Sequence, residues 1–566
     1  MKKILKIFAI TNVLILALVA VAGFFLYQNY NKGKKETKKV ALEELDMQVY
    51  GVTKEDISED VIYPLYLSGA EKNVETYAYD STNDIYNVKT SKHVKADLEE
   101  KKKKTKYTID NCLWAYNPFG THDFSLYLYL KATDVTSLRY TVHVEDENIP
   151  DFTRTANVDA SLIGTKEIEC LIAGLVPGVQ NYIILKLEND SGKIIKRIVY
   201  SLTPPKTKGE VQNQLILTDG PSLTERSNGL YMFFGHDAEN KKMRPAIYLF
   251  DNSGILRGSI PIVKGETCQV LFLNGCMLYN YSGTNFASVS PLGQVVKIYQ
   301  LSGYRSVNDY VYDGFGNIVT IATKKGASSI EDQLVSINLE TGKTAHLVDM
   351  RSLLKKVKKK STDSSDWIGL NSVVWAGSDS VLVSARELSG ILKIRNISSV
   401  NPTIEYIIGD ASLWKKQGKT KGLLTKYVDP NNTTTLNTDP FLSQYGQSSL
   451  ALSTIDEQYP SNETQYYLTM FDNNYKKKKT DTSYYYKYYV DETAGTYDLA
   501  KTFKIPYSTY ESSVQEYAGN IIVNSGTDCS VGEYDTEGGL ISQLKYNVET
   551  YTYRVMKFDF KNFWFS

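Results

Sequence analysis

The side chains best suited to chemistry lie in the segment 366–410, where polar residues interrupt apolar runs. Arg386 ends the run VLVSAR, and Asn371 opens the run NSVVWA. A guanidinium group can hold a sulfate, phosphate or carboxylate through two parallel hydrogen bonds, and an amide can add a further donor. Arg386 and Asn371 are therefore candidates for binding an anionic group. Arg386 could equally form a structural ion pair, for example with Asp366.

These residues lie within one predicted unit of antiparallel sheet. Apolar residues alternate in NSVVWA, VLVSAR and ILKIRN, turn residues separate the runs, and TIEYIIG provides a closing strand. Three or four short strands in about forty residues is the size of one propeller blade. Similar turns followed by strands recur at FDNSG (250), SPLGQ (290), NLETGK (338), NISSVNP (396), FDNNYK (471) and YDTEGG (534). The region 206–566 is thus predicted to be a β-propeller with these turns in its outer hairpins.

The order of motifs in this region resembles the bacterial arylsulfotransferase family. The matching stretches are VNDYVYDGFGNIVTIA (307–322), DWIGLNS (366–372), SAREL (384–388), IIGD (407–410) with Trp414, and QYGQSS (444–449). The resemblance implies a six-bladed propeller that transfers a sulfuryl group from an aryl sulfate to a phenol. It also implies a histidine nucleophile that is transiently sulfurylated, with other histidines and an arginine around the sulfate. We expect neither a cofactor nor a metal.

The positions where the resemblance implies histidine hold other residues. They are Asn308, preceded by Val307, then Gly369, and finally Ser448. Each stands where a loop enters the first strand of a blade, so we expect all three at one mouth of the central channel. None can replace imidazole, because serine without a neighbouring base is a weak nucleophile and glycine has no side chain. Whether the protein is an enzyme is therefore left open.

Two functions remain open at this stage. One is an arylsulfotransferase-family protein with little or no sulfuryl transfer. The other is a non-catalytic propeller that binds a small aromatic, sulfated or otherwise anionic ligand, or a partner protein. The remaining histidines lie elsewhere, and only His236, in the polar loop HDAENKK, is a candidate for compensation; the others are His93, His122, His143 and His346.

The N-terminal residues predict a membrane anchor over 1–28. Residues 7–26 form an uncharged apolar run, which is long enough to cross a bilayer as a helix. Lys2, Lys3 and Lys6 precede it and favour an N-terminus inside the cell. The competing interpretation is a signal peptide cleaved after the small residues 20–22. We expect a single-pass membrane protein whose later domains lie outside the cytoplasm.

Two further segments separate this anchor from the propeller. Residues 29–106 are polar and rich in lysine, with a candidate helix at 94–104, and are predicted to form a partly helical stalk. Residues 107–205 contain short apolar runs between turn residues, which indicates a small β-sandwich. This part resembles immunoglobulin or fibronectin type III domains, and the domain that precedes the propeller in membrane-anchored arylsulfotransferases of Gram-positive bacteria. The predicted fold class is all-β.

Charge and cysteine content indicate which partners, metal sites and disulfides can be expected. Lysine plus arginine and aspartate plus glutamate both number 64, so no overall field favours nucleic acid as a partner. The lysine runs 354–360 and 415–421 are predicted to form a basic rim near the mouth, or to be solvated insertions. The cysteines show no metal-binding spacing. Either Cys112 and Cys170 form a disulfide, or all five cysteines are buried free thiols; the oligomeric state is not predicted.

Overall fold

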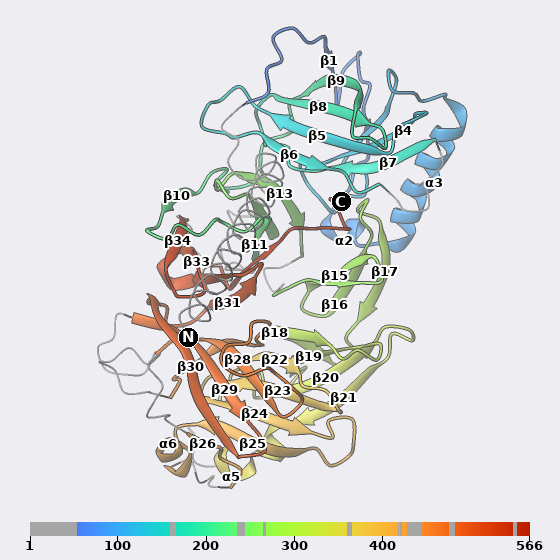
Figure 1. The fold of residues 1–566 in the computed structure, drawn as a ribbon. Coiled ribbons are helices and arrows are strands. Elements are labelled where there is room, and N and C mark those ends of the chain that lie inside the picture. Colours follow the sequence, from blue (N-terminus) through green and yellow to red (C-terminus); the bar gives the residue numbers. More distant parts are fainter. Residues whose placement is uncertain are drawn as a thin grey trace, which may run out of the picture. The chain divides into compact units, whose positions relative to one another are not determined.

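The computed structural model describes residues 54–158, 166–234, 244–263, 268–358, 365–416, 418, 421–426, 443–474, 482–546 and 552–566. The chain divides into two compact units, Met1–Lys54 and Glu55–Ser566, and the second unit contains the described fold. Strands dominate this unit, which confirms the all-β class (Figure 1). Within the described ranges, no helix is both long and apolar enough to span a membrane. The predicted anchor at 7–26 lies outside those ranges.

A β-sandwich forms the first part of this unit. Its described strands are β1 (Ile62–Pro64), β2 (Glu75–Thr76), β3 (Leu113–Tyr116), β4 (Leu126–Lys131), β5 (Ser137–His143), β6 (Phe152–Thr155), β7 (Glu167–Ile172), β8 (Asn181–Glu188) and β9 (Ile194–Leu202). One sheet has the order β1-β9-β8-β5-β6, and the other has the order β2-β3-β4-β7. Leu128 of β4 and Tyr140 of β5 share one buried core, so the sheets pack face to face. The predicted β-sandwich is confirmed.

The polar segment before the sandwich packs against the folded unit. β1 pairs in parallel with β9, and β2 pairs in parallel with β3. Two helices follow, α2 (Thr82–Ile85) and α3 (Val88–Lys104). Val94 and Leu98 lie one helical turn apart in α3, and both are buried against Tyr127 and Tyr129 of β4. The helix expected at 94–104 is confirmed, but the stalk expected over 29–106 must be corrected for residues 54–106, because this apolar stripe docks α3.

Six sheets make up the region that follows, in the part of the chain that the structure describes. Written from one edge to the other, the first sheet consists of β35 (Arg554–Phe558), β11 (Leu230–Phe234), β12 (Ala246–Phe250) and β13 (Leu256–Pro261), and the second of β14 (Leu271–Leu273), β15 (Cys276–Ser282), β16 (Asn285–Val289) and β17 (Val295–Gln300). The third sheet consists of β18 (Tyr304–Tyr312), β19 (Asn317–Lys324), β20 (Gln333–Asn338) and β21 (Thr344–Asp349), and the fourth of β22 (Leu370–Trp375), β23 (Ser380–Ala385), β24 (Gly390–Arg395) and β25 (Thr403–Gly409). The fifth sheet consists of β27 (Ser448–Leu452), β28 (Gln465–Asp472), β29 (Thr482–Asp491), β30 (Thr496–Pro506) and β26 (Thr425–Lys426), and the sixth of β31 (Ser512–Tyr517), β32 (Asn520–Ser525), β33 (Ser530–Tyr534), β34 (Leu540–Lys545) and β10 (Ile216–Asp219). Short helical turns α4 (Met350–Leu353), α5 (Lys355–Lys358), α6 (Ala411–Lys416) and η2 (Gly526–Asp528) lie between strands.

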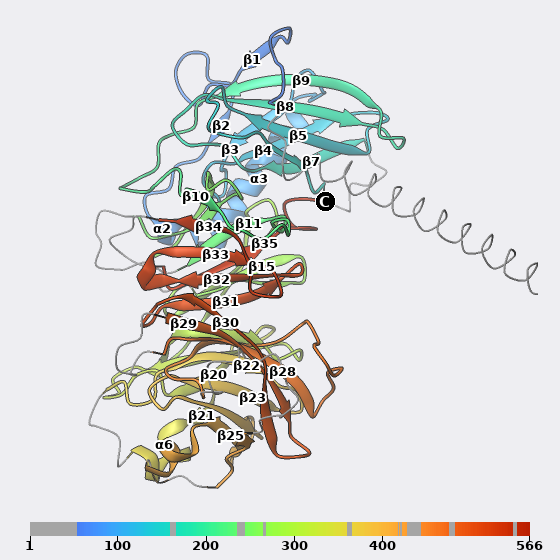
Figure 2. The same cartoon turned by 60° about the vertical axis from the view of Figure 1, so that its left-hand side comes forward.

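The first strands of these sheets, which we call the inner strands, are β35, β14, β18, β22, β27 and β31. Contacts link β18 to β22, β22 to β27, β27 to β31 and β31 to β35. Phe272 of β14 packs against Phe558 of β35, and Gln269, just before β14, hydrogen-bonds to Tyr310 of β18. The sheets therefore join in a cycle. The C-terminal strand β35 pairs with β11, so the end of the chain closes the cycle on its beginning (Figure 2).

The predicted turns match hairpins between strands in every case. Those beginning at 250, 290, 338, 396 and 534 connect the third and fourth strands of their sheets, counted from the inner strand. The turn beginning at 471 is different, because it lies between β28 and β29, the second and third strands of its sheet. Its expected place in an outer hairpin was wrong. The outer hairpin of that sheet joins β29 to β30 instead, with Gly495 in the left-handed conformation that this tight turn requires.

The last residues of the chain pack between the sandwich and the sheets. Trp564 is buried, stacks on Phe560 with ring centroids 4.3 Å apart, and meets the edge of His122 at 4.4 Å. The backbone N–H of Asn157 donates to the Trp564 carbonyl at 3.0 Å. Burial lowers the pKa of His122 to about 4. The C-terminal residues thus tie the sandwich to the cycle of sheets.

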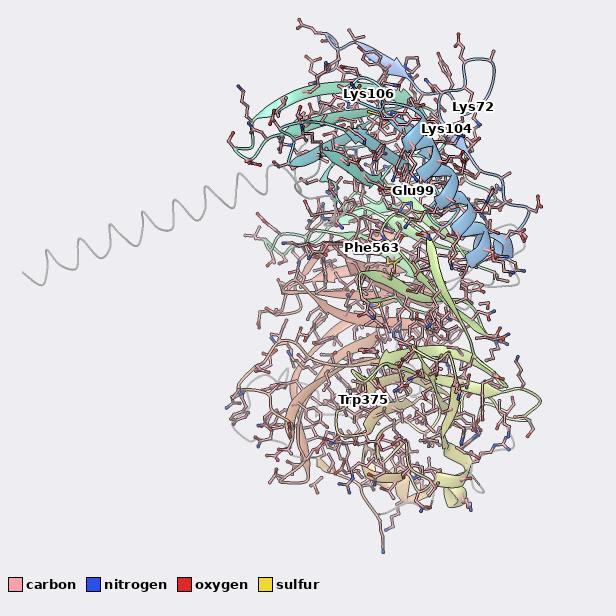
Figure 3. All side chains as sticks on the ribbon, turned by 90° about the vertical axis from the view of Figure 1, so that its right-hand side faces the viewer. Lys72, Glu99, Lys104, Lys106, Trp375 and Phe563 are labelled. Carbon is pink, nitrogen blue, oxygen red and sulfur yellow. The ribbon has the colours of Figure 1, made fainter. Side chains whose placement is uncertain are left out.

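We expect Trp564→Ala to lower the free energy of unfolding by about 3–5 kcal/mol, because it empties a closely packed aromatic site. Trp375→Ala is the matched control, since Trp375 is half-buried at the end of β22 and its ring faces the exposed Phe315 (Figure 3). Its expected cost is about 1 kcal/mol. Denaturant unfolding of both variants measures the difference. Equal losses would contradict the role assigned to Trp564.

Candidate functional site

Three neighbouring inner strands bring the predicted site positions together. Asn308 lies at a bulge in β18, and its amide donates to the Leu370 carbonyl at 2.8 Å, next to Gly369. The Asn371 amide donates to the Gln447 carbonyl at 2.8 Å, next to Ser448. The backbone therefore places Asn308, at the bulge within β18, beside Gly369 and Ser448, which lie at the starts of β22 and β27. Asn308 thus lies within its strand and not where a loop enters it, which corrects that part of the expectation, and a channel mouth at these positions stays a prediction.

Arg386 follows β23 and pairs with two carboxylates. Its guanidinium donates to Asp366, and its Nε donates to Glu387 Oε1 at 3.1 Å. Burial alone would lower the pKa of Arg386, but Asp366, Glu331 and Glu387 hold that pKa above its ordinary value. One of the two roles considered for this residue, an ion pair with Asp366, is thus present. An anion could bind Arg386 only in competition with these carboxylates.

Gly369 lies directly against this ion pair. Its φ is +55°, in the left-handed region that glycine adopts most easily. A Cβ at this position would lie 3.1 Å from Asp366 Oδ1 and 3.2 Å from Arg386 Nη2. Any side chain would therefore need both a strained backbone and a shift of the ion pair.

The other predicted residues are held by hydrogen bonds. The Ser448 hydroxyl is buried and lies 3.1 Å from both Asn473 Oδ1 and the Ser512 carbonyl. No histidine is among the hydrogen-bond partners found for Ser448 in the described ranges. Asn371 is only 4% exposed, and its amide bridges two inner strands. The anion-binding role of Asn371 stays a prediction, and its observed contacts are structural.

Glu331 joins the same cluster, and the sequence analysis missed it. It precedes β20, has a φ of +55°, and its carbonyl accepts a hydrogen bond from the Leu370 N–H at 3.1 Å. Its Oε2 is buried and has no hydrogen-bond partner among the described residues. Burial, together with the negative charge of Asp366, raises the pKa of Glu331 to about 7. An isolated glutamate in a loop gives no sequence signal for this, because the shift arises from neighbours distant in the chain.

The cluster formed by Asn308, Glu331, Asp366, Arg386 and Glu387 can bind polar groups and exchange a proton near neutral pH.

His346 does not belong to this cluster. It lies on β21, the outermost strand of its sheet, with Nε2 3.1 Å from Gln333 Oε1. His236 lies outside the described residues. In the ranges that the structure describes, no group of three or more His, Cys, Asp or Glu side chains could hold a metal ion.

The lysine runs and the cysteines add little to this site. The run 354–360 overlaps α5 and the run 415–421 begins in α6, but both extend beyond the described residues, so the basic rim stays a prediction. All five cysteines are free, and burial raises the pKa of Cys112 to about 12. The expected free thiols are confirmed and the alternative Cys112–Cys170 disulfide is absent, but only Cys170 and Cys268 are buried, so the expected burial of all five was wrong.

Comparisons with known proteins give two family matches. A family model described as arylsulfotransferase (ASST) matches residues 203–556, and one described as arylsulfotransferase Ig-like domain matches residues 113–205. No curated protein matches the chain.

Solved structures give more distant likenesses. An auxiliary nutrient binding protein from Bacteroides ovatus is 13% identical, with 75% of this chain and 94% of that chain covered and a TM-score of 0.32. A similar protein from Bacteroides thetaiotaomicron is 12% identical, with 76% and 95% covered and a TM-score of 0.30. An inactive variant of virginiamycin B lyase from Staphylococcus aureus is 11% identical, with 60% and 89% covered and a TM-score of 0.30. At such TM-scores these likenesses carry no argument about this chain.

We expect Glu331→Gln to make the stability less dependent on pH. Since the folded state raises the pKa of Glu331 from 4.5 to about 7, its contribution to stability is fully present below the unfolded pKa and is lost as pH rises through about 7. The variant should therefore gain about 2–3 kcal/mol relative to the wild type between about pH 5 and pH 8. The exposed residue Glu340 provides the control, Glu340→Gln. Parallel unfolding curves for Glu331→Gln and the wild type across this range would contradict the placement of Glu331.

We expect Gly369→Ala to destabilise the protein more than Gly377→Ala. Both glycines have a left-handed backbone, so both changes incur strain of about 1 kcal/mol. Only at Gly369 does the added methyl group meet other atoms within 4 Å, namely those of Asp366 and Arg386. Chemical denaturation should give a larger loss for Gly369→Ala. An equal loss for the two variants would show that the ion pair does not crowd position 369.

Proposed function

Because this chain belongs to the arylsulfotransferase (ASST) family, we propose that it is a member that binds a small anionic aromatic ligand without transferring a sulfuryl group through histidine. In this proposal the six sheets are the blades of a six-bladed β-propeller, and the ligand binds at the mouth where β18, β22 and β27 meet. The cycle of inner-strand contacts supports six blades. The preceding sandwich is the family's Ig-like domain.

The observation that carries the proposal is the set of contacts around Gly369 and Arg386. A histidine route requires a side chain that attacks sulfur and then leaves as a good cationic group. Asn308 and Ser448 cannot do this, and the space beside Gly369 is occupied by the Arg386–Asp366 ion pair. We infer that the family histidines are replaced at these three positions. What remains is a guanidinium group that can hold an anion when Asp366 or Glu387 gives way.

Glu331 supports one refinement of this proposal. With Glu331 protonated, Arg386 faces fewer negative charges, so the mouth accepts an anionic ligand more readily below about pH 7. The same carboxyl group is the best candidate for a base if any transfer between phenols takes place. It supplies no evident nucleophile of the histidine type.

The proposed setting is the outer face of a cell membrane. The uncharged apolar run at 7–26 and the lysines before it support an uncleaved single-pass anchor. The family domains at 113–205 and 203–556 both follow this run and would lie outside the cytoplasm.

The test uses the purified full chain with p-nitrophenyl sulfate as donor and phenol as acceptor. We expect no release of nitrophenol above background, and binding of p-nitrophenyl sulfate that weakens about tenfold in Arg386→Ala. Arg395→Ala is the control, because Arg395 is an exposed arginine that also pairs with a carboxylate, Glu405. Release of nitrophenol that Arg386→Ala abolishes would contradict the proposal. Release that only Glu331→Gln abolishes would indicate transfer assisted by a carboxyl group.

A further inference from the structure

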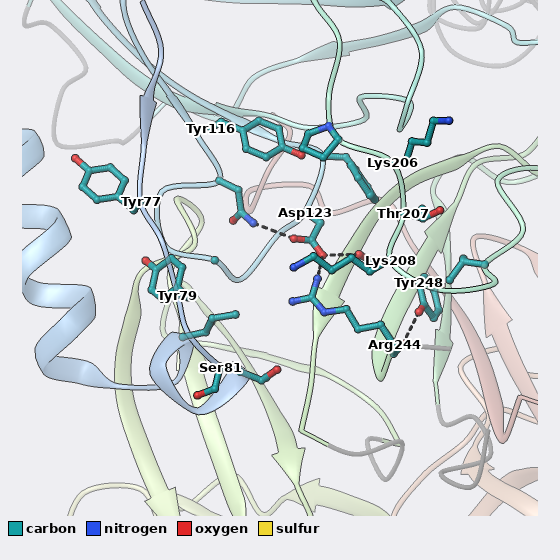
Figure 4. Close-up of a pocket in the computed structure, with 18 of the residues that line it drawn as sticks. Tyr77, Tyr79, Ser81, Tyr116, Asp123, Lys206, Thr207, Lys208, Arg244 and Tyr248 are labelled. Carbon is teal, nitrogen blue, oxygen red and sulfur yellow. Dashed lines mark hydrogen bonds and ion pairs between the residues drawn. The ribbon is translucent and has the colours of Figure 1, made fainter. Parts of the chain in front are cut away.

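A pocket that shares no lining residue with the Arg386 cluster lies at the junction of the sandwich and the first sheet of the cycle. Its volume is about 380 Å³, within the range of small-molecule sites (Figure 4). The segment 77–85, the sandwich loop 116–124, the linker 205–211 and the β12–β13 sheet contribute its lining. Junctions between domains are common places for ligand pockets.

Aromatic rings form much of the wall of this junction pocket. Tyr77, Tyr79, Tyr116 and Tyr248 all line it. The hydroxyl of Tyr79 donates to the Pro118 carbonyl at 2.6 Å, that of Tyr77 donates to Asp97 at 2.5 Å, and that of Tyr248 donates to the Arg244 carbonyl at 2.5 Å. Because these hydroxyls are held by the protein, the rings are fixed in orientation. Fixed aromatic walls suit a flat apolar ring.

The floor of the pocket is the Asp123 carboxylate, whose oxygens accept hydrogen bonds from neighbouring side chains. Asp123 accepts hydrogen bonds from Arg244 at 2.8 Å, from Ser259 at 2.9 Å and from Asn117 at 3.1 Å (Figure 4). Its backbone N–H also donates to the Ser259 carbonyl at 2.8 Å, so the sandwich loop is attached to β13 at this point. Both carboxylate oxygens of Asp123 therefore already accept hydrogen bonds from the protein, so Asp123 does not attract a cationic ligand.

Two lysines give the pocket an excess of positive charge. Lys206 and Lys208 are exposed on the linker, and no ion pair or side-chain hydrogen bond of either is found among the described residues. Burial raises the pKa of Asp123, and the positive charge of Lys208, which lies near this carboxyl, partly offsets the rise. With Arg244 the lining has three cationic groups against two carboxylates, Asp80 and Asp123. An anionic group would find unpaired partners at this rim.

We propose that the junction pocket binds a small aromatic anion, with its ring against the tyrosines and its anionic group between Lys206 and Lys208. This site is separate from the Arg386 cluster and does not depend on the function proposed for that cluster. Because the pocket is lined by the sandwich, the linker and the sheets, a bound ligand holds these three parts together. Ligand binding should consequently raise the temperature of unfolding.

The experiment uses p-hydroxybenzoate with the full chain, followed by calorimetric titration and thermal unfolding. Phenol supplies the ring without the charge, and acetate supplies the charge without the ring. We expect p-hydroxybenzoate to bind at least about tenfold more tightly than either and to raise the unfolding temperature. The double variant Lys206→Gln with Lys208→Gln should lose about tenfold in affinity, whereas the exposed control pair Lys89→Gln with Lys193→Gln should not.

Three outcomes would overturn the proposal. Undiminished binding in the Lys206→Gln, Lys208→Gln variant would place the ligand elsewhere. Acetate that binds as well as p-hydroxybenzoate would show a site for simple anions. Loss of binding in Arg386→Ala would assign the ligand to the mouth instead, so failure here is distinguishable from failure of the proposed function.

Discussion

The structure depends on hydrogen bonds that link five of the inner strands, β18, β22, β27, β31 and β35. A polar side chain on one inner strand accepts a hydrogen bond from a backbone N–H of its neighbour: Asp309 from Val373 at 3.0 Å, Ser372 from Leu450 at 3.0 Å, Ser449 from Val514 at 3.0 Å, and Ser513 from Val555 at 3.1 Å. Arg554 of β35 then donates to Asp309 at 2.9 Å, between two buried side chains. Because buried N–H groups must be paired, these contacts fix how the sheets meet.

These contacts hold the inner strands together independently of the candidate site residues beside them. Three residues of the inner-strand network are preceded directly by a candidate site residue: Asp309 by Asn308, Ser372 by Asn371, and Ser449 by Ser448. The network residue maintains the frame, while the residue before it is free to differ as long as it fits between strands. In this chain the amides of Asn308 and Asn371 add hydrogen bonds to neighbouring carbonyls, and Arg386 is balanced by carboxylates. The cluster around Arg386 is therefore polar and held by internal hydrogen bonds and ion pairs, which suits the binding role proposed for it.

Much of this fold follows from local sequence patterns, and the exceptions have physical causes. Alternating apolar runs and turn residues predicted the sandwich and most outer hairpins. The docking of α3 was missed, because two apolar residues among many lysines were enough to bury one face. The turn at 471 was assigned to the wrong hairpin, because a turn signal does not say which strand of a sheet it follows. Glu331 could not be found from sequence, since its proton affinity depends on Asp366 and on burial. The anchor at 7–26 stays a prediction.

The central claim is that the mouth binds an aryl sulfate beside Arg386 and leaves it chemically intact. A crystal structure of the protein soaked with p-nitrophenyl sulfate tests this most directly, because it shows both the position and the chemical state of the ligand. The account predicts the intact ester next to Arg386, with Asp366 or Glu387 displaced from the guanidinium group and no modified side chain. A sulfurylated residue at the mouth, or separate nitrophenol and sulfate there, would contradict it.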